Sequence, residues 1–253
     1  MAALSEILLE LDRLLEPDAF SDYCPNGLQV EGRGEVQRIA TGVSASSEFF
    51  ERALEADADL LLTHHGLFWT GDDVRVVGRH RERLRLLLAA DVSLVAYHLP
   101  LDAHPTFGNN ALIATGIGGT LEAPFAAVAG RDIGWRARFD DDGVTASELA
   151  ERLRALTGRE PLTFAFGPQR IRTIGIVSGG GARNVTDAIA AGLDAFITGE
   201  PAEWARAVAR ESAIHFIAAG HHATETFGVR ALGEHLAERF GGEHTYIDIE
   251  NPV

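Results

Sequence analysis

Short, unbroken apolar runs alternate along this chain with longer segments whose apolar residues recur at helical spacing. The run Leu60-Leu61-Leu62 is typical of a strand buried on both faces. Residues 4–15 carry apolar side chains at helical spacing and predict a helix that ends before Pro17. Further strands are expected over residues 39–43, 93–97, 131–139, 173–177, 194–198, 214–218 and 245–249, and further helices over 48–56, 81–90, 145–157, 184–191 and 228–240. This alternation predicts an α/β fold with largely parallel strands.

The pattern of the first half recurs in the second half. At a constant offset of 135 residues, Asp59 matches Asp194 and Thr63 matches Thr198. The same offset relates Ile39 to Ile174, Ala53 to Ala188, Ala56 to Ala191 and Trp69 to Trp204; smaller offsets relate His98 to His221, Asp102 to Glu225, and Phe107-Gly108 to Phe227-Gly228. The polar residues 71–81, expected as an exposed insertion, lie between Trp69 and His98 and account for the smaller offsets from His98 onward. We therefore predict two similar α/β repeats, residues 1–122 and 123–253, with a shared cleft between them.

Side chains with metal-binding chemistry follow the predicted buried strands. The strand at 60–62 leads into Thr63-His64-His65-Gly66, where a turn at Gly66 is expected to bring both imidazoles to one site. In the open α/β sheet expected here, ligands bind at the carboxyl ends of the strands. The corresponding strand ends supply the other candidates: His98, Asp102, His221 and Glu225, with Glu200 near them. A surface histidine pair in a loop is the alternative for His64 and His65.

Imidazoles and carboxylates without thiolates are typical of catalytic zinc, manganese or iron sites. Cys24 is the only cysteine, so a thiolate cluster and an intrachain disulfide are both excluded. Five or six candidate ligands exceed the four that one zinc ion takes, which favours two divalent ions with Asp102 and Glu225 able to bridge them. The alternative is a set of hydrogen-bonded histidines at domain edges.

Composition narrows the function further. The net charge of −15 argues against generic binding to nucleic acid or an anionic membrane. All 22 basic residues are arginine, which excludes Schiff-base chemistry on lysine and a P-loop lysine. No signal peptide and no apolar run of transmembrane length are evident, so we expect a cytoplasmic protein.

Asn26 and Gln29 are expected in a simple turn, and Gly179-Gly180-Gly181 is only weak evidence for phosphate binding. The histidines set aside as ligands are His80, His104, His215, His222, His235 and His244.

Four motifs resemble those of the Nif-three-like dinuclear-metal proteins, also called GTP cyclohydrolase 1 type 2 homologues. They are Thr63-His64-His65-Gly66, Tyr97-His98-Leu99-Pro100-Leu101-Asp102, Ile197-Thr198-Gly199-Glu200 and Gly220-His221-His222-Ala223-Thr224-Glu225; Asn26-Gly27-Leu28-Gln29-Val30 resembles the family's amino-terminal motif. The resemblance spans nearly the whole chain. It implies two intertwined α/β lobes, with metal ligands His64, His65, Asp102, His221 and Glu225. His98 and Glu200 are then supporting residues around the ligands.

The same resemblance implies a homohexamer and a metal-dependent hydrolase that opens a nucleotide-like ring, with a small molecule as substrate. Two other functions stay open from the residues alone. One is a non-catalytic carrier or insertase for metal ions, and the other is a regulatory scaffold whose metals are structural. An open coordination position favours the hydrolase, whereas metal that transfers to an acceptor favours the carrier.

Overall fold

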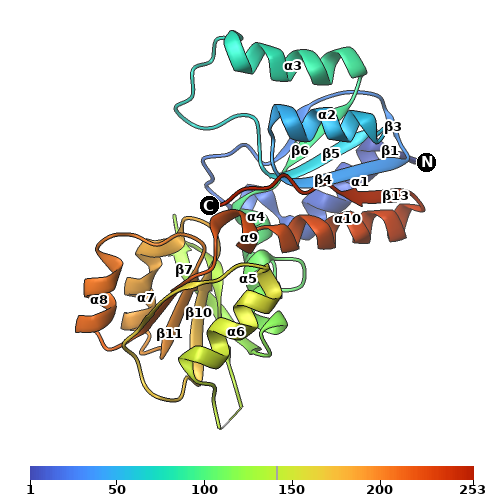
Figure 1. The fold of residues 1–253 in the computed structure, drawn as a ribbon. Helices are drawn as coiled ribbons and strands as arrows, with labels where there is room; N and C mark the ends of the chain where they lie inside the picture. Colours follow the sequence, from blue (N-terminus) through green and yellow to red (C-terminus); the bar gives the residue numbers. More distant parts are fainter. Residues whose placement is uncertain (141) are drawn as a thin grey trace. The chain divides into compact units, whose positions relative to one another are not determined.

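The computed structural model describes residues 1–140 and 142–253 and divides them into two compact units. Unit 1 comprises Met1–Leu101 and Gly228–Glu250, and unit 2 comprises Asp102–Phe227 and Asn251–Val253. Each unit has its own sheet with helices packed on it (Figure 1). The predicted α/β fold is therefore confirmed. None of the helices in the described part of the chain combines the length and the apolar composition needed to cross a membrane.

The sheet of unit 1 has the strand order β13-β4-β5-β6-β2. Its strands are β13 (Glu243–Tyr246), β4 (Arg38–Ser44), β5 (Leu60–His65), β6 (Ser93–Ala96) and β2 (Gly27–Val30). The first four run parallel, and β2 pairs antiparallel with β6. β5 is central, and its residues from Leu60 to His64 are fully buried, as the continuous apolar run predicts.

Helices pack on this sheet through the apolar residues of one face each. The helices of unit 1 are α1 (Leu4–Leu15), α2 (Ser47–Glu55), α3 (Gly78–Ala90) and most of α10 (Thr226–Phe240), with the short elements β1 (Ala2–Ala3), η1 (Pro17–Ala19) and β3 (Glu35–Val36). Phe49 and Phe50 of α2 and Leu87 of α3 share one core cluster with Leu61 and Leu94 of the sheet. That cluster places α2 and α3 on the same face of the sheet (Figure 1).

The sheet of unit 2 has the strand order β7-β8-β10-β11-β12-β9. Its strands are β7 (Thr120–Val128), β8 (Arg131–Arg138), β10 (Thr173–Val177), β11 (Ala195–Thr198), β12 (His215–Ala218) and β9 (Leu162–Ala165); its helices are α5 (Asn109–Gly116), α6 (Ala146–Thr157), η2 (Gly181–Asn184), α7 (Val185–Ala190), α8 (Ala205–Glu211) and α9 (His221–Thr224). The strands β10, β11 and β12 run parallel, between the antiparallel β8 and β9. The edge strands β7 and β9 were not predicted, because few of their residues are buried and the apolar pattern is correspondingly weak.

The two sheets repeat one arrangement. In both, three parallel strands are followed by an antiparallel strand that precedes them in the chain: β4-β5-β6-β2 and β10-β11-β12-β9. The register also repeats, because Ile39 faces Leu60 in unit 1 and Ile174 faces Ala195 in unit 2, both shifted by the predicted offset. These matches support the interpretation of an internal duplication.

Asp59 and Asp194, which the sequence offset matches, have the same role in both units. Asp59 accepts hydrogen bonds from the backbone amides of Gln37 (3.0 Å) and Arg38 (2.9 Å), at the start of β4. Asp194 accepts them from the amides of Arg172 (2.8 Å) and Thr173 (2.9 Å), at the start of β10. Each aspartate therefore joins the start of its own strand to the start of the neighbouring one.

The compact units do not coincide with the predicted repeats 1–122 and 123–253. The chain passes into unit 2 within α4 (Leu99–Ala103) and returns to unit 1 within α10. Thus α5 and β7, at the end of the first half, belong to unit 2, whereas most of α10 and all of β13, at the end of the second half, belong to unit 1. The physical reason is pairing: β13 completes the sheet beside β4, and β7 pairs with β8. The repeat boundaries themselves stay a prediction.

Candidate metal centre

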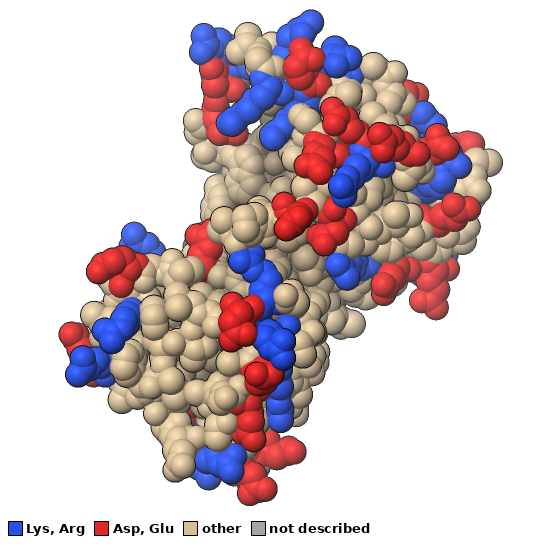
Figure 2. All heavy atoms as spheres, in the orientation of Figure 1, with Lys and Arg blue, Asp and Glu red and all other residues tan. Residues whose placement is uncertain are grey.

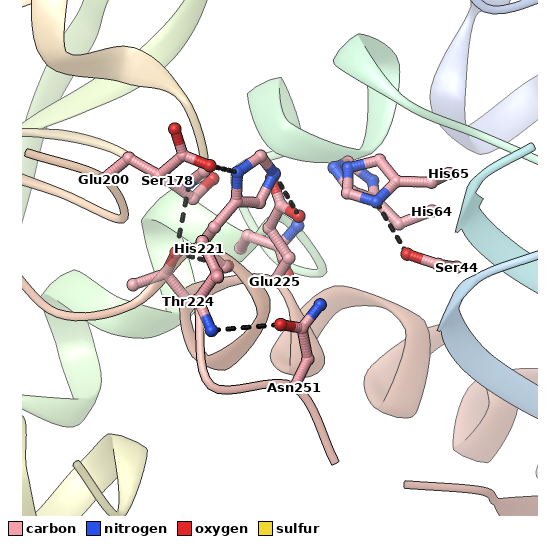
Figure 3. Close-up of polar contacts among 12 residues, drawn as sticks. Ser44, His64, His65, Ser178, Glu200, His221, Thr224, Glu225 and Asn251 are labelled. Atoms are coloured by element: carbon pink, nitrogen blue, oxygen red, sulfur yellow. Dashed lines mark hydrogen bonds and ion pairs between the residues drawn. The ribbon is translucent and has the colours of Figure 1, made fainter. Parts of the chain in front are cut away.

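The carboxyl end of β5 presents two adjacent imidazoles. The ring centroids of His64 and His65 are 4.9 Å apart. His64 Nδ1 lies 3.1 Å from the backbone oxygen of Tyr97, and His65 Nδ1 lies 3.0 Å from the hydroxyl oxygen of Ser44 (Figure 3). Each ring is therefore fixed through Nδ1, which makes Nε2 the nitrogen through which it would bind a metal ion.

His98 adds a third imidazole in the same unit. Its ring centroid lies 4.9 Å from that of His64 and 5.7 Å from that of His65. Each of the three rings has a nitrogen within 4.8 Å of a nitrogen of the other two. These three residues, which we call the histidine cluster, therefore form a group that can hold a divalent ion.

The orientation of His98 depends on Asp22. His98 Nδ1 lies 2.9 Å from Asp22 Oδ1, and both side chains are more than nine-tenths buried. Burial disfavours the carboxylate, but His98, with the backbone amides of Leu99 and Cys24, outweighs burial and lowers the pKa of Asp22 to about 2. Asn26 completes the arrangement, because its Oδ1 accepts a hydrogen bond from the His98 amide at 2.8 Å. Asn26 therefore supports His98 and is more than the simple turn residue that was expected.

Gly66 has a different role from the predicted turn. β5 continues through His65, and the backbone angle φ of Gly66 is not positive. A Cβ atom at Gly66 would lie 2.2 Å from Gln29 Nε2, so the absent side chain makes room for Gln29. The Gln29 side chain accepts a hydrogen bond from the Leu67 amide (2.7 Å) and donates one to the Pro25 carbonyl (2.7 Å). Gln29 thereby fixes the chain just beyond the two histidines.

Unit 2 holds the candidate carboxylate Asp102 in a polar, buried environment. Asp102 is 5% exposed. Its Oδ1 accepts hydrogen bonds from Asn109 Nδ2 at 2.8 Å and from the Ser178 hydroxyl at 3.1 Å. Asp102 lies in α4, a short helix that also contains Pro100. Ligating carboxylates are typically held by hydrogen bonds of this kind.

His221 and Glu225 lie together in unit 2, one helical turn apart. Figure 3 shows the His221 ring between Glu200 and Glu225. His221 Nδ1 is 2.6 Å from Glu200 Oε1, and Nε2 is 3.2 Å from Glu225 Oε2. Burial opposes the charged ring, but Glu225 and then Glu200 outweigh burial and raise the pKa of His221 to about 9. Glu200 thus lies against the ring nitrogen opposite Glu225, and its role as a supporting residue stays a prediction.

The turn after β10 brings backbone against these two side chains. Gly179 has a φ of +59°, and a Cβ atom there would lie 2.1 Å from Glu225 Oε1 and 3.1 Å from His221 Nε2. The Gly179 carbonyl accepts from the amides of Gly199 (3.0 Å) and Glu200 (2.8 Å). The glycine turn therefore serves the approach of Glu225 and His221, a role that the sequence motif alone did not reveal.

The sequence pattern sets His215 aside and misses Asp22 altogether. His215 begins β12, and its Nε2 lies 2.8 Å from the Pro168 carbonyl oxygen, in agreement with a structural role. Asp22 is separated from its partner His98 by 76 residues, and no local pattern marks it. The one sequence feature that could have pointed to Asp22 is its place four residues before Asn26, the first residue of the amino-terminal motif.

The two α/β sheets, with imidazoles and carboxylates following their parallel strands, define a protein with candidate divalent-metal ligands. A model of the family described as Duf34/NIF3 (NGG1p interacting factor 3) matches residues 2–252. The chain belongs to this family, which confirms the resemblance drawn from the four motifs.

Bacterial relatives match this chain along nearly their whole lengths. A Pseudomonas aeruginosa protein named GTP cyclohydrolase 1 type 2 homolog is 48% identical over 251 residues, which cover 99% of each chain. A Vibrio cholerae protein with the same name is 46% identical over 249 residues, which cover 96% of each chain.

Solved structures agree with the fold. One described as "Structural genomics, protein ybgI, unknown function" has a TM-score of 0.93 and 42% identity, and TTHA1606 from Thermus thermophilus has a TM-score of 0.89 and 36% identity; each comparison covers 100% of both chains. Reduced HcgD from Methanocaldococcus jannaschii, at 22% identity and a TM-score of 0.84, shows the fold alone.

Proposed function

We propose that this protein binds two divalent metal ions through His64, His65, Asp102, His221 and Glu225, and uses them to hydrolyse a nucleotide-like ring. One observation carries the proposal. The imidazoles of the ligands His64, His65 and His221 each have Nδ1 within hydrogen-bond distance of an oxygen atom, of Tyr97, Ser44 and Glu200 respectively. This is the arrangement by which proteins orient histidines toward a metal.

The donor set fits zinc, iron or manganese, because it consists of imidazole nitrogens and carboxylate oxygens. Asp102 is held by hydrogen bonds from Asn109 and Ser178, which fix the position of its carboxylate. Glu200 holds the His221 ring from the side opposite Glu225. When bound, a divalent ion of this kind acts as a Lewis acid and lowers the pKa of a water molecule toward neutrality. The name that the relatives carry, GTP cyclohydrolase 1 type 2 homolog, supports a nucleotide ring as the substrate class.

The test combines metal content with turnover. We expect elemental analysis of the purified protein, after reloading with zinc, manganese or iron, to give two ions per chain. The loaded protein is then screened against nucleoside triphosphates by absorbance and by chromatography of the products. Fewer than two ions per chain contradicts the dinuclear centre. Full loading without turnover, together with transfer of metal to an acceptor protein, supports a carrier instead.

We also propose that the protein assembles as a homohexamer, as the family resemblance implies. Light scattering at micromolar concentration is expected to give about six times the chain mass. A monomer under these conditions contradicts the assembly without affecting the metal proposal.

A further inference from the structure

The segment that follows the candidate ligands of β5 lines a cavity within unit 1. The volume of the cavity is about 660 Å³, and its walls come from residues 66–69, from the segment 72–77 and from the start of α3. Trp69 joins the cavity to the histidine cluster, because its ring lies 5.8 Å from that of His65 and 5.3 Å from that of His98. A ligand in this cavity would therefore lie beside the imidazoles of β5.

The cavity presents two arginines that no carboxylate neutralises. Arg79 and Arg83 lie one turn apart on α3, line the cavity, and form no ion pair with any residue that the structure describes. Arg81 and Arg85 of the same helix do not line the cavity, and both bond to Glu82. The pairing therefore separates the arginines of α3 into a neutralised pair away from the cavity and an unneutralised pair on its wall.

The surroundings of Arg83 disfavour the positive charge of its guanidinium group. Its Nε is buried and has no hydrogen-bond partner in the described chain. Burial and the nearby charge of Arg79 both lower the pKa of Arg83. In a chain with a net charge of −15, two adjacent cations that form no ion pair with the described residues are unusual, and a bound anion would relieve both effects.

The start of α3 adds to the positive potential. The helix has 13 residues, its N-cap residue Val77 offers no side-chain hydrogen bond, and its first turn contains no acidic residue. Helices normally begin with acidic or capping residues because their first amide groups are unpaired. Figure 2 shows basic side chains gathered over the region of α3. Because Val77, Arg79 and His80 line the cavity, the positive end of the α3 dipole lies at the same wall as Arg79 and Arg83.

The remaining walls supply aromatic and acidic groups. Phe68 and Trp69 line the cavity, and Phe68 meets His80 edge to face at 5.3 Å between ring centroids. Asp73 also lines it but pairs with Arg75 at 2.6 Å. Asp72 is the other acidic residue of the wall, so the lining arginines outnumber the lining aspartates by three to two.

We propose that this cavity binds a phosphorylated aromatic compound of the nucleotide class, with the phosphate on Arg79 and Arg83 and the ring against Phe68 and Trp69. This proposal rests on the proposed function, which identifies the metal centre as the place of reaction. The cavity would hold the substrate beside that centre. Arginine suits the role because its planar guanidinium matches the oxygens of a phosphate group.

Isothermal titration calorimetry with the metal-loaded full-length protein tests the pocket without measuring turnover. GMP, guanosine, ribose 5-phosphate and inorganic phosphate are the probes. We expect GMP to bind more tightly than the other three, and Arg79→Gln and Arg83→Gln each to weaken GMP binding at least about tenfold. Arg85→Gln is the matched control, because it removes the same charge from the same helix outside the cavity, and it should leave GMP affinity unchanged.

Metal content and thermal unfolding of each variant show that the ligands and the fold are intact. Absent GMP binding overturns the proposal, and so does an equal loss of affinity in Arg85→Gln. Inorganic phosphate that binds as tightly as GMP overturns the aromatic half of it. GMP binding that depends on Arg79 and Arg83, in a protein that turns over no nucleotide, upholds the pocket while it contradicts the proposed hydrolysis.

Discussion

Replacing Gly179 by alanine tests the construction of the centre in unit 2. The new Cβ atom would lie 2.1 Å from Glu225 Oε1, a separation that side chains do not tolerate, so the carboxylate must retreat. Glu225 is 2% exposed and packed beside His221, which limits the directions in which it can move. We therefore expect Gly179→Ala to separate Glu225 from His221 and to lower the number of metal ions bound.

The magnitude follows from two contributions. The positive φ of Gly179 costs alanine about 1–2 kcal/mol in the folded state. Loss of a buried, charged hydrogen bond between His221 and Glu225 adds about 1–3 kcal/mol. The sum, roughly 2–5 kcal/mol, corresponds to a lowering of Tm by at least about 4 °C for a chain of this length.

Gly192→Ala is the matched control. Gly192 has a φ of +66°, close to that of Gly179, and apart from its neighbours in the chain no atom of the described residues lies within 4 Å of the position of its Cβ. It measures the backbone contribution alone, which thermal unfolding should report as about 1–2 kcal/mol with the metal content unchanged. If Gly179→Ala matches Gly192→Ala in both Tm and metal content, the close approach of Glu225 to the glycine turn does not hold the centre, and our reasoning about it is refuted.

Three further changes test other parts of the structure. Asp102→Ala should weaken metal binding by more than the roughly 10–100-fold typical of supporting residues, whereas His98→Ala should keep both ions, as elemental analysis will show. The hydrogen bond from Arg13, against the opposing effect of burial, lowers the pKa of Glu10 to about 2, so the ionised Glu10 stabilises the fold fully only above its ordinary pKa of 4.5. In urea unfolding the wild type should therefore lose stability as the pH falls from about 4.5 to about 2, whereas Glu10→Gln should not show this loss. Asp59→Ala leaves two backbone amides without their acceptor and should cost about 2 kcal/mol in calorimetric unfolding.

The sequence predicted most of what lies on central strands. Continuous apolar runs mark β5 and β6 because both faces of these strands are buried, and the ligand candidates follow directly from the strand ends. Local patterns carry this information because the residues involved are neighbours in the chain.

The contacts that orient the ligands were harder to predict, because they join distant parts of the chain. Asp22 reaches His98 from an irregular segment, and Gln29 reaches Leu67 across 38 residues. The sequence predicts a turn at Gly66, whereas its role is to admit the Gln29 side chain. A glycine needed for a close approach and a glycine needed for a turn look the same in a sequence. Only the structure distinguishes them.

The return of the chain to unit 1 has a consequence for the order of events during synthesis. Residues 102–227 are contiguous, so nearly all of unit 2 has been synthesised before residues 228–250 are made. Until β13 arrives, β4 is an unpaired edge strand beside a buried core, and such edges invite pairing with other chains. We expect unit 2 to fold first and unit 1 to close last, although unit 1 contains the amino terminus. A nascent chain stalled after residue 227 should therefore expose the edge of β4 to a chaperone or to a second copy.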